Sequence, residues 1–230
     1  MGESAERIPL GVSPGGETSR GSVESAKRSP LGVSPDGELA RAPADPARPV
    51  VGVLALQGDF EAHAKILHQL GAAAREVRVP ADLDGLDALV LPGGESTVIT
   101  LGIEREGLGE PLCELVRSGT PVLGTCAGMI MLDRAHLGVL DIEARRNAFG
   151  RQLHSFEADL DVAGVPGGPV HAVFIRAPWV AEIGPGVKVL AEVDGHPVAV
   201  RQGNVIAVSF HPELTGEARL HELLLALAAA

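Results

Sequence analysis

Apolar runs alternate with helical patterns along the chain from residue 50 onward. Residues 50–56 form a continuous apolar run, which is typical of a strand buried on both faces. A helical pattern then covers residues 59–70. The alternation continues through a short strand candidate at 76–79, apolar runs at 88–91 and 121–124, and helical stretches at 112–117 and 129–132. Strands that alternate with helices predict parallel βαβ units in a doubly wound sheet.

The second half of the chain has a different pattern, with strands and little helix between them. Its strand-like stretches are residues 156–162, 170–175, 187–193, 197–200 and 205–210. A closing helix is expected from about residue 215. The predicted fold class is therefore α/β, a flavodoxin-like doubly wound parallel sheet with an added antiparallel portion.

Residues 1–48 are set apart by their composition. Gly, Pro and Ser fill 20 of these 48 positions, and Ile, Leu, Val and Phe together contribute only 7. Such a stretch buries too little apolar surface to offset the entropy lost on ordering. A segment that begins at Pro9 recurs from Pro30, but two copies are fewer than a solenoid needs. We predict a disordered low-complexity extension, or a stretch read from a misplaced gene start, followed by one domain over residues 49–230.

The composition of the 230 residues narrows the classes of function. A net charge of −11 argues against binding of nucleic acid, and 3% aromatic residues without Tyr argue against a base-stacking platform. No apolar run has the length of a membrane span, and the N-terminus lacks a signal-peptide core. The two cysteines fit neither a disulfide scaffold nor a zinc motif. We therefore expect no metal, no cofactor, no membrane and a reducing, cytoplasmic location.

The clearest chemical motif is Gly124-Thr125-Cys126-Ala127-Gly128, between a buried strand and a helical stretch. A sharply bent strand-to-helix turn requires small neighbours around a nucleophile. The turn also places the thiol at a helix N-terminus, where partial positive charge favours the reactive thiolate. A buried core cysteine is the alternative for Cys126. That alternative is preferred for Cys113, which lies in a helical pattern with no glycine beside it.

A nucleophilic cysteine needs a base, and His211 is the best candidate among eight histidines. It ends a strand-like run, and Pro212 favours an extended conformation for it. In an extended segment, residues 211 and 213 point to the same side, so the Glu213 carboxylate can fix the His211 tautomer. A turn histidine beside a solvated glutamate is the alternative. Cys126 and His211 both follow strands of one predicted sheet, and active sites form at the carboxyl ends of such strands.

The other histidines are weaker candidates. His63 and His68 lie five positions apart on a predicted helix and share no face, so we expect them at the surface or behind the site. His221 is expected to be solvated in the terminal helix. Four more histidines have no convincing acidic partner nearby: His136, His154, His171 and His196.

Acyl chemistry also needs hydrogen-bond donors for a developing oxyanion. Residues 91–96, Leu-Pro-Gly-Gly-Glu-Ser, end a predicted strand and open a helix. Their two glycines let backbone N–H groups approach a ligand closely. An ordinary strand-to-helix turn is the alternative. A phosphate-binding loop is not supported, because no Lys-Ser/Thr pair follows at the required spacing.

Together these motifs resemble class I (triad) glutamine amidotransferases, and within that class the glutaminase subunits of pyridoxal 5'-phosphate synthase. The Cys126 turn and the His-Pro-Glu run at 211–213 are general to the class, whereas the runs at 146–152 and 173–178 are specific to this subunit. The resemblance covers residue 50 to about 225. It rests on residues 54–58 (LALQG), 91–97 (LPGGEST), 124–130 (GTCAGMI), 146–152 (RNAFGRQ), 155–157 (SFE), 173–178 (VFIRAP) and 209–215 (SFHPELT).

The resemblance implies a role for each matching residue. Cys126 would be the nucleophile, and His211 with Glu213 would complete its triad. The backbone N–H groups of Gly94 and Ala127 would be the oxyanion donors. Six residues match substrate-binding positions of the family: Gly94, Glu95, Ser96, Arg146, Ile175 and Arg176.

The implied reaction is hydrolysis of L-glutamine to L-glutamate and ammonia. The thiolate would attack the carboxamide, and water activated by the histidine would cleave the resulting thioester. By the resemblance, the ammonia passes to a synthase subunit in a large hetero-oligomer. That subunit builds pyridoxal 5'-phosphate from a pentose phosphate and a triose phosphate, and the glutaminase activity is expected to depend on it.

Two features depart from the family pattern, and neither touches the triad. The segment between Leu132 and His136 is several residues shorter than in relatives, which is expected to shorten the helix after the nucleophile or the loop beyond it and to affect a partner contact there. Residues 1–48 have no counterpart. Two other hypotheses stay open: a cysteine hydrolase or redox-sensing protein on a similar fold, and a non-catalytic interaction subunit.

Overall fold

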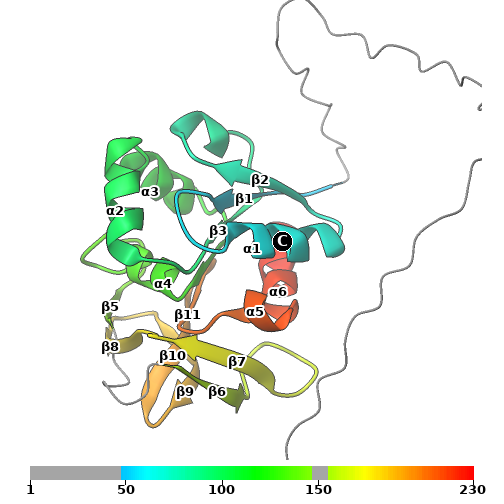
Figure 1. The fold of residues 1–230 in the computed structure, drawn as a ribbon, viewed down its shortest axis with the longest axis vertical. Coiled ribbons are helices and arrows are strands. Elements are labelled where there is room, and N and C mark those ends of the chain that lie inside the picture. The colour runs from blue at the N-terminus through cyan, green and yellow to red at the C-terminus, as the bar shows by residue number, and fades with distance from the viewer. Residues whose placement is uncertain (1–47, 147–154) are drawn as a thin grey trace, which may run out of the picture. The chain divides into compact units, whose positions relative to one another are not determined.

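The computed structural model describes residues 48–146 and 155–230, and a seven-stranded sheet runs through it (Figure 1). From one edge to the other, its strands are β2 (Ala73–Val77), β1 (Val50–Leu54), β3 (Ala88–Leu91), β4 (Val122–Thr125), β11 (Val205–Val208), β10 (His196–Gln202) and β9 (Lys188–Val193). The first five pair in parallel, and the last two add antiparallel strands at one edge. The predicted α/β sheet with an antiparallel addition is confirmed.

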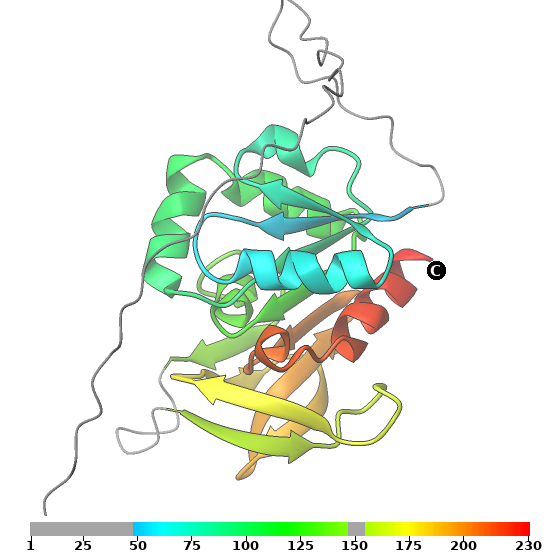
Figure 2. The same cartoon turned by 45° about the vertical axis from the view of Figure 1, so that its right-hand side comes forward.

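Helices cover both faces of the parallel strands (Figure 2). Val51 and Val53 of β1 belong to the core on one face, and Leu54 belongs to the core on the other. One face is covered by α1 (Phe60–Gln69) and α6 (Arg219–Ala228), and the other by α2 (Ser96–Arg105), α3 (Gly109–Arg117) and α4 (Ala127–Leu132). Because both faces are covered, successive residues of a strand are all buried, which explains the continuous apolar runs in the sequence.

Two antiparallel ribbons flank the main sheet. One pairs β6 (Ser155–Leu160) with β7 (Val170–Ile175), and the other pairs β5 (Ile142–Arg145) with β8 (Trp179–Ile183). The ring of Phe174 packs between those of Phe156 and Phe210. Its centroid lies 4.4 Å from that of Phe156 and 5.6 Å from that of Phe210. This contact ties β7 to the segment that follows β11. On β8, the ring of Trp179 stacks on His196, with centroids 3.6 Å apart.

Several predicted boundaries differ from those in the structure. β2 runs from Ala73 to Val77, whereas the sequence predicted a short strand at 76–79. The run at 205–210 is a strand only as far as Val208. The closing helix is two helices, α5 (Pro212–Thr215) and α6, because Gly216 adopts a left-handed conformation with φ 69° between them. A short 3₁₀ helix, η1 (Pro80–Leu83), was not predicted.

Some sequence predictions lie outside the described residues. These include the interpretation of residues 1–47, most of the run at 146–152, and the environment of His154. The domain boundary at 48/49 and the effect of the short segment after Leu132 stay predictions. Among the helices of the described residues, none combines the length and the apolar character that crossing a membrane would require.

Candidate active site

The candidate site lies where three neighbouring strands end. β3, β4 and β11 are adjacent and parallel, so the segments after them meet at the carboxyl edge of the sheet. Gly93 follows β3 and lies between Cys126 and His211. A Cβ atom added to Gly93 would stand 3.0 Å from Nδ1 of His211 and 3.2 Å from Cβ of Cys126. The absence of a side chain at Gly93 therefore allows the other two residues to come together.

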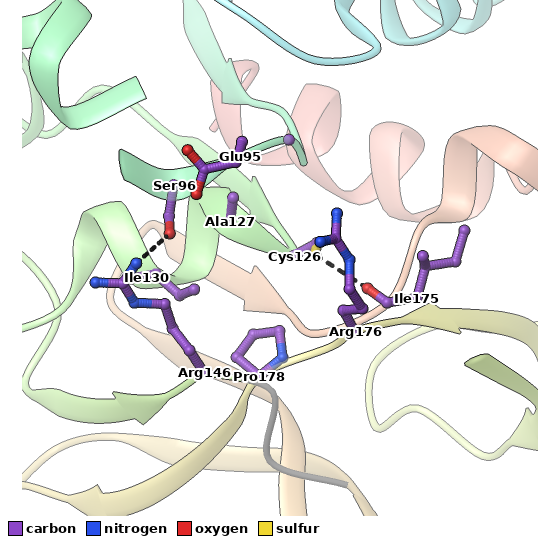
Figure 3. A pocket seen from close by; sticks show the side chains of 10 residues that line it. Glu95, Ser96, Cys126, Ala127, Ile130, Arg146, Ile175, Arg176 and Pro178 are labelled. Carbon is purple, nitrogen blue, oxygen red and sulfur yellow. Dashed lines mark hydrogen bonds between the residues drawn. The ribbon is translucent and has the colours of Figure 1, made fainter. Parts of the chain in front are cut away.

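Cys126 occupies the sharp turn between β4 and α4. Its φ of 49° and ψ of −106° are rare for a residue with a side chain, and such strain persists where the surrounding structure imposes it. Its backbone N–H donates to the Val208 carbonyl oxygen at 2.8 Å. Gly128 allows α4 to pack closely, because a Cβ atom there would overlap the Leu91 carbonyl oxygen. The Cys126 sulfur lies 4.0 Å from the Ile175 carbonyl oxygen (Figure 3).

His211 contacts both Cys126 and Glu213. Its Nδ1 lies 2.6 Å from Oε1 of Glu213, which leaves Nε2 for the Cys126 thiol. The sequence argument expected an extended segment to bring residues 211 and 213 to the same side. Instead, Pro212 opens α5 and Glu213 lies in the first turn of that helix. The expected contact is made, but the local conformation that makes it is helical.

The surroundings of His211 change its charge state. Burial alone would lower its pKa, but hydrogen bonds to the Cys126 thiol and the Glu213 carboxylate raise the pKa from 6.5 to about 10. His211 is therefore protonated at neutral pH. An imidazolium next to the sulfur stabilises a thiolate, which is the nucleophilic form of cysteine.

A pocket opens beside the Cys126 sulfur (Figure 3). Three of its lining side chains are charged: Glu95, Arg146 and Arg176. The guanidinium of Arg146 donates to the Ser96 hydroxyl at 2.9 Å. The lining residues are Gly94, Glu95, Ser96, Cys126, Ala127, Ile130, Arg146, Ile175, Arg176 and Pro178. All six residues predicted to bind substrate are among them.

The loop after β3 is fixed by several hydrogen bonds. The Glu95 carboxylate caps α2 by accepting from the backbone N–H groups of Thr97 and Val98, at 3.3 Å and 3.0 Å. These bonds lower the pKa of Glu95, so its side chain is negatively charged at neutral pH. The Glu95 backbone N–H donates to Oε1 of Gln57 at 2.5 Å. Gln57, which the sequence argument did not assign to the site, thus holds the loop from the segment that follows β1.

Two histidines lie buried behind the site, and for His221 this position was not expected. His221 was expected to be solvated, but it is fully buried, and its Nε2 lies 2.9 Å from Nδ1 of His63. His63 is also fully buried, so of its two expected positions, at the surface or behind the site, the second is the one found. Its Nε2 lies 3.3 Å from Oε2 of Glu213 and 3.3 Å from Oγ1 of Thr125. The sequence argument missed this contact with Glu213.

The prediction that no acidic partner lies close in sequence is wrong for His136, and His171 has acidic partners that are distant in the sequence. Nδ1 of His136 lies 2.7 Å from Asp133, and the His171 ring is 2.7 Å from Asp159 and 3.2 Å from Glu157. Asp159 and Glu157 face His171 across the β6–β7 ribbon, so their distance along the chain concealed the pairing. Neither histidine lines the pocket.

Other groups in the described chain give no sign of a second reactive centre. Cys113 is buried in α3, and its thiol donates to the Leu137 carbonyl oxygen at 3.2 Å, which fits a core cysteine. Both Cys113 and Cys126 are free thiols. Over residues 48–146 and 155–230, no group of three or more His, Cys, Asp or Glu side chains could hold a metal ion.

Sequence comparison relates nearly all the described residues to one family. A model of the SNO glutamine amidotransferase family matches residues 53–228. The chain is 56% identical over 184 residues to the pyridoxal 5'-phosphate synthase subunit PdxT of Streptomyces avermitilis, which covers 76% of this chain and 92% of that protein. It is 53% identical over 184 residues to PdxT of Mycobacteroides abscessus, which covers 76% and 95%.

Solved structures agree with this relation. A crystal structure of a glutamine amidotransferase superposes with a TM-score of 0.73 at 49% identity, covering 78% of this chain and 99% of that chain. The structure of PurLQS from Thermotoga maritima superposes with a TM-score of 0.64 at 17% identity, covering 79% and 98%. The second likeness shows a shared fold alone.

Proposed function

Because the chain belongs to the SNO glutamine amidotransferase family, we propose that it hydrolyses L-glutamine to L-glutamate and ammonia with Cys126, His211 and Glu213 as a triad. One observation carries the assignment of these residues. A single imidazole contacts the strained cysteine on one side and a buried carboxylate on the other, beside a pocket with charged walls. That is the arrangement that nucleophilic catalysis by cysteine requires.

The mechanism follows from the positions of these groups. The Cys126 thiolate attacks the side-chain carbonyl carbon of glutamine, and the negative charge on the oxygen is held by the backbone N–H groups of Gly94 and Ala127. Ala127 is the first residue of α4, so its N–H has no partner within the helix. The His211 imidazolium gives its proton to the departing nitrogen, which leaves as ammonia. Neutral His211 then takes a proton from water, and the hydroxide cleaves the thioester to glutamate.

The charges around the pocket fit a free amino acid. Glutamine is a zwitterion, so its ammonium group needs an anion and its α-carboxylate needs a cation. Glu95 supplies the negative charge, and Arg146 and Arg176 supply the positive charge. Arg176 adopts a left-handed conformation with φ 46°, which directs the chain as it leaves β7 at Ile175. We assign Gly94, Ser96 and Ile175 to the same binding surface.

The ammonia is the product that a partner would use. The related proteins are named as subunits of pyridoxal 5'-phosphate synthase. By that relation, this chain delivers ammonia to a synthase subunit within a hetero-oligomer, for the synthesis of pyridoxal 5'-phosphate (vitamin B6). A cytoplasmic location would suit its two free thiols, because thiols persist in a reducing compartment.

The test is ammonia release from L-glutamine, measured with and without the synthase subunit of the same cell. Wild type with the subunit should release ammonia, and Cys126→Ala should fall to the background rate. Cys113→Ala is the matched control, because that thiol is buried in α3, and it should keep the wild-type rate. Equal release by Cys126→Ala and wild type would exclude the proposed triad.

A further inference from the structure

A buried set of polar side chains continues from Glu213 away from the pocket. Its members are His63 on α1, Thr125 at the end of β4, and His221 on α6. All three are fully buried, and none lines the pocket. The mechanism above uses none of them.

We infer that His63 is a positioning residue of the proposed site, which donates a hydrogen bond from Nε2 to Oε2 of Glu213 and so holds that carboxylate against His211. The inference rests on the proposed function, because it gives a role to the side of the triad that faces away from the substrate. His221 acts behind His63 by fixing the position of its proton.

The two oxygens of Glu213 have different surroundings. Oε1 is 2.6 Å from the His211 ring, whereas the fully buried Oε2 lies 3.3 Å from Nε2 of His63. Over the described residues Oε2 makes no hydrogen bond of good geometry, and Nε2 of His63, 3.3 Å away, is the side-chain nitrogen that faces it. A buried carboxylate oxygen without a donor is costly, so the proton that satisfies it belongs on the facing nitrogen of His63.

The surroundings of Nδ1, the second ring nitrogen of His63, explain why the proton stays on Nε2. A neutral imidazole has one N–H, and Nδ1 of His63 lies 2.9 Å from Nε2 of His221. If His63 carried its proton on Nδ1, the Nε2 lone pair would face the Glu213 carboxylate, which is repulsive. His221 therefore donates from Nε2, and His63 accepts at Nδ1 and donates at Nε2.

The surroundings keep both histidines neutral. The groups that face them are Glu213 and His211 toward the pocket, with Cys126 beyond, and Glu217 near His221. Burial and the neighbouring His221 and His211 lower the pKa of His63, and burial lowers the pKa of His221 to about 4. Both rings therefore keep a single N–H at neutral pH, as the proposed chain of hydrogen bonds needs.

Thr125 connects this set to the glycine turn of the site. Its hydroxyl oxygen lies 3.3 Å from Nε2 of His63 and accepts the Gly93 backbone N–H at 3.0 Å. His63 thus lies against both the carboxylate that aims His211 and the turn that follows β3. Without the donor from His63, we expect Glu213 to rotate and to leave His211 less firmly held.

Two substitutions that differ by one methylene separate positioning from packing. His63→Asn keeps a polar atom near the former Nδ1, which can still bond His221, but it is too short to reach Glu213. His63→Gln places an amide N–H near the former Nε2, which can replace the lost donor. His68→Asn is the control, because His68 is exposed on the same helix.

The first measurement is glutamine hydrolysis by the full chain with the synthase subunit. We expect His63→Asn to lower kcat by about 10- to 100-fold with KM unchanged, as is common when a residue that orients a catalytic group is lost. His63→Gln should recover most of the loss, and His68→Asn should match wild type. A wild-type kcat in His63→Asn would overturn the inference.

The second measurement needs no glutamine and no partner. The His211 ring is titrated by NMR in the folded full chain, where its pKa is raised to about 10. His63→Asn should lower this pKa by about one unit or more, and His63→Gln should restore it. An unchanged His211 pKa in His63→Asn would overturn the inference, whatever the glutaminase assay shows. If wild type released no more ammonia than Cys126→Ala, that result would count against the proposed function alone.

Discussion

His211 is the residue of the candidate triad whose pKa changes strongly on folding. Its ring is largely buried between a thiol and a carboxylate, and its pKa is raised from 6.5 to about 10. A group whose pKa is higher in the folded than in the unfolded chain stabilises the fold while it is protonated. The stabilisation is complete below about pH 6.5 and is lost as the pH rises through about 10.

Because the pKa of His211 is raised, wild type should be more stable than a variant that lacks the imidazole, by an amount that depends on pH. The free energy of unfolding of wild type relative to His211→Gln should be greatest near pH 6.5 and should shrink toward pH 10. The change should be about 1.4 kcal/mol or more, since one pKa unit corresponds to about 1.4 kcal/mol. Urea unfolding at a series of pH values measures it, and a difference that stays constant over this range would contradict the prediction.

Single residues differ in how well the sequence identifies them. Cys126 and the pair His211 and Glu213 stand in short motifs, so the sequence could select them as candidates, although the pair is brought together by a helical turn and not by the extended segment that was expected. His63 and His221 pair across 158 positions, and no local pattern reports such a contact. Their burial could have been expected from helical spacing. His63 shares a face with the buried Ile66 and Leu67, and His221 with the buried Leu224.

Among the elements, the packing of α4 against the end of β3 determines the Cys126 turn. Gly128 is the closest point, because the Leu91 carbonyl oxygen occupies the space that a Cβ atom would need. Helix propensity alone favours alanine over glycine by about 1 kcal/mol. At Gly128 the preference for alanine is opposed by a clash between the added Cβ atom and the Leu91 backbone. Backbone atoms cannot rotate away from such a clash as a side chain can.

Two glycine-to-alanine substitutions in helices should therefore have opposite effects. Gly128→Ala should lower the free energy of unfolding by about 1–3 kcal/mol, the usual cost of an overpacked position, and should reduce activity by shifting Cys126. Gly109→Ala in α3 is the control, because the nearest atom to its added Cβ is at an ordinary 3.9 Å. It should leave stability unchanged or raise it by up to about 1 kcal/mol. Thermal and urea unfolding compare them, and a stabilised Gly128→Ala would refute the argument.

The sequence predicted best the elements with a regular apolar pattern, either continuous as in β3 or alternating as in β7. β3 and β7 have the predicted bounds, and β1, β4 and α1 lie within two residues of them at each end. β2 is an edge strand in which only Val77 is buried, so its apolar pattern is weak. β5 and β8 were missed because their ribbon is partly exposed and pairs residues far apart in sequence. Local sequence patterns indicate which residues are buried, but they do not indicate which distant segments pair with one another.

At the scale of the whole domain, Arg48, the first described residue, is held by side-chain hydrogen bonds. The Arg48 guanidinium donates to the carbonyl oxygens of Gly71 and Ala72, at 2.9 Å and 2.8 Å, where the chain passes from α1 to β2. The Val50 backbone N–H then donates to the Asp87 carboxylate at 2.7 Å. Residues from 48 onward thus join the sheet directly.

Deletion of residues 1–47 should leave both folding and activity as they are in the full chain. Thermal unfolding and glutamine hydrolysis with the synthase subunit measure the two properties. Arg48→Ala in the shortened chain should lower the free energy of unfolding by about 1 kcal/mol, because two hydrogen bonds are lost. If the deletion itself reduced the melting temperature or the rate, the prediction that residues 1–47 lie outside the domain would be wrong.

The stacked pair on β8 has a practical consequence. The chain has one Trp and no Tyr, so its near-ultraviolet fluorescence comes from Trp179. This indole rests on the His196 imidazole, and the preceding residue, Pro178, forms part of the pocket wall. Emission from the intact protein therefore originates beside the place where a substrate would dock, and it can follow ligand binding or the loss of that environment without an attached dye.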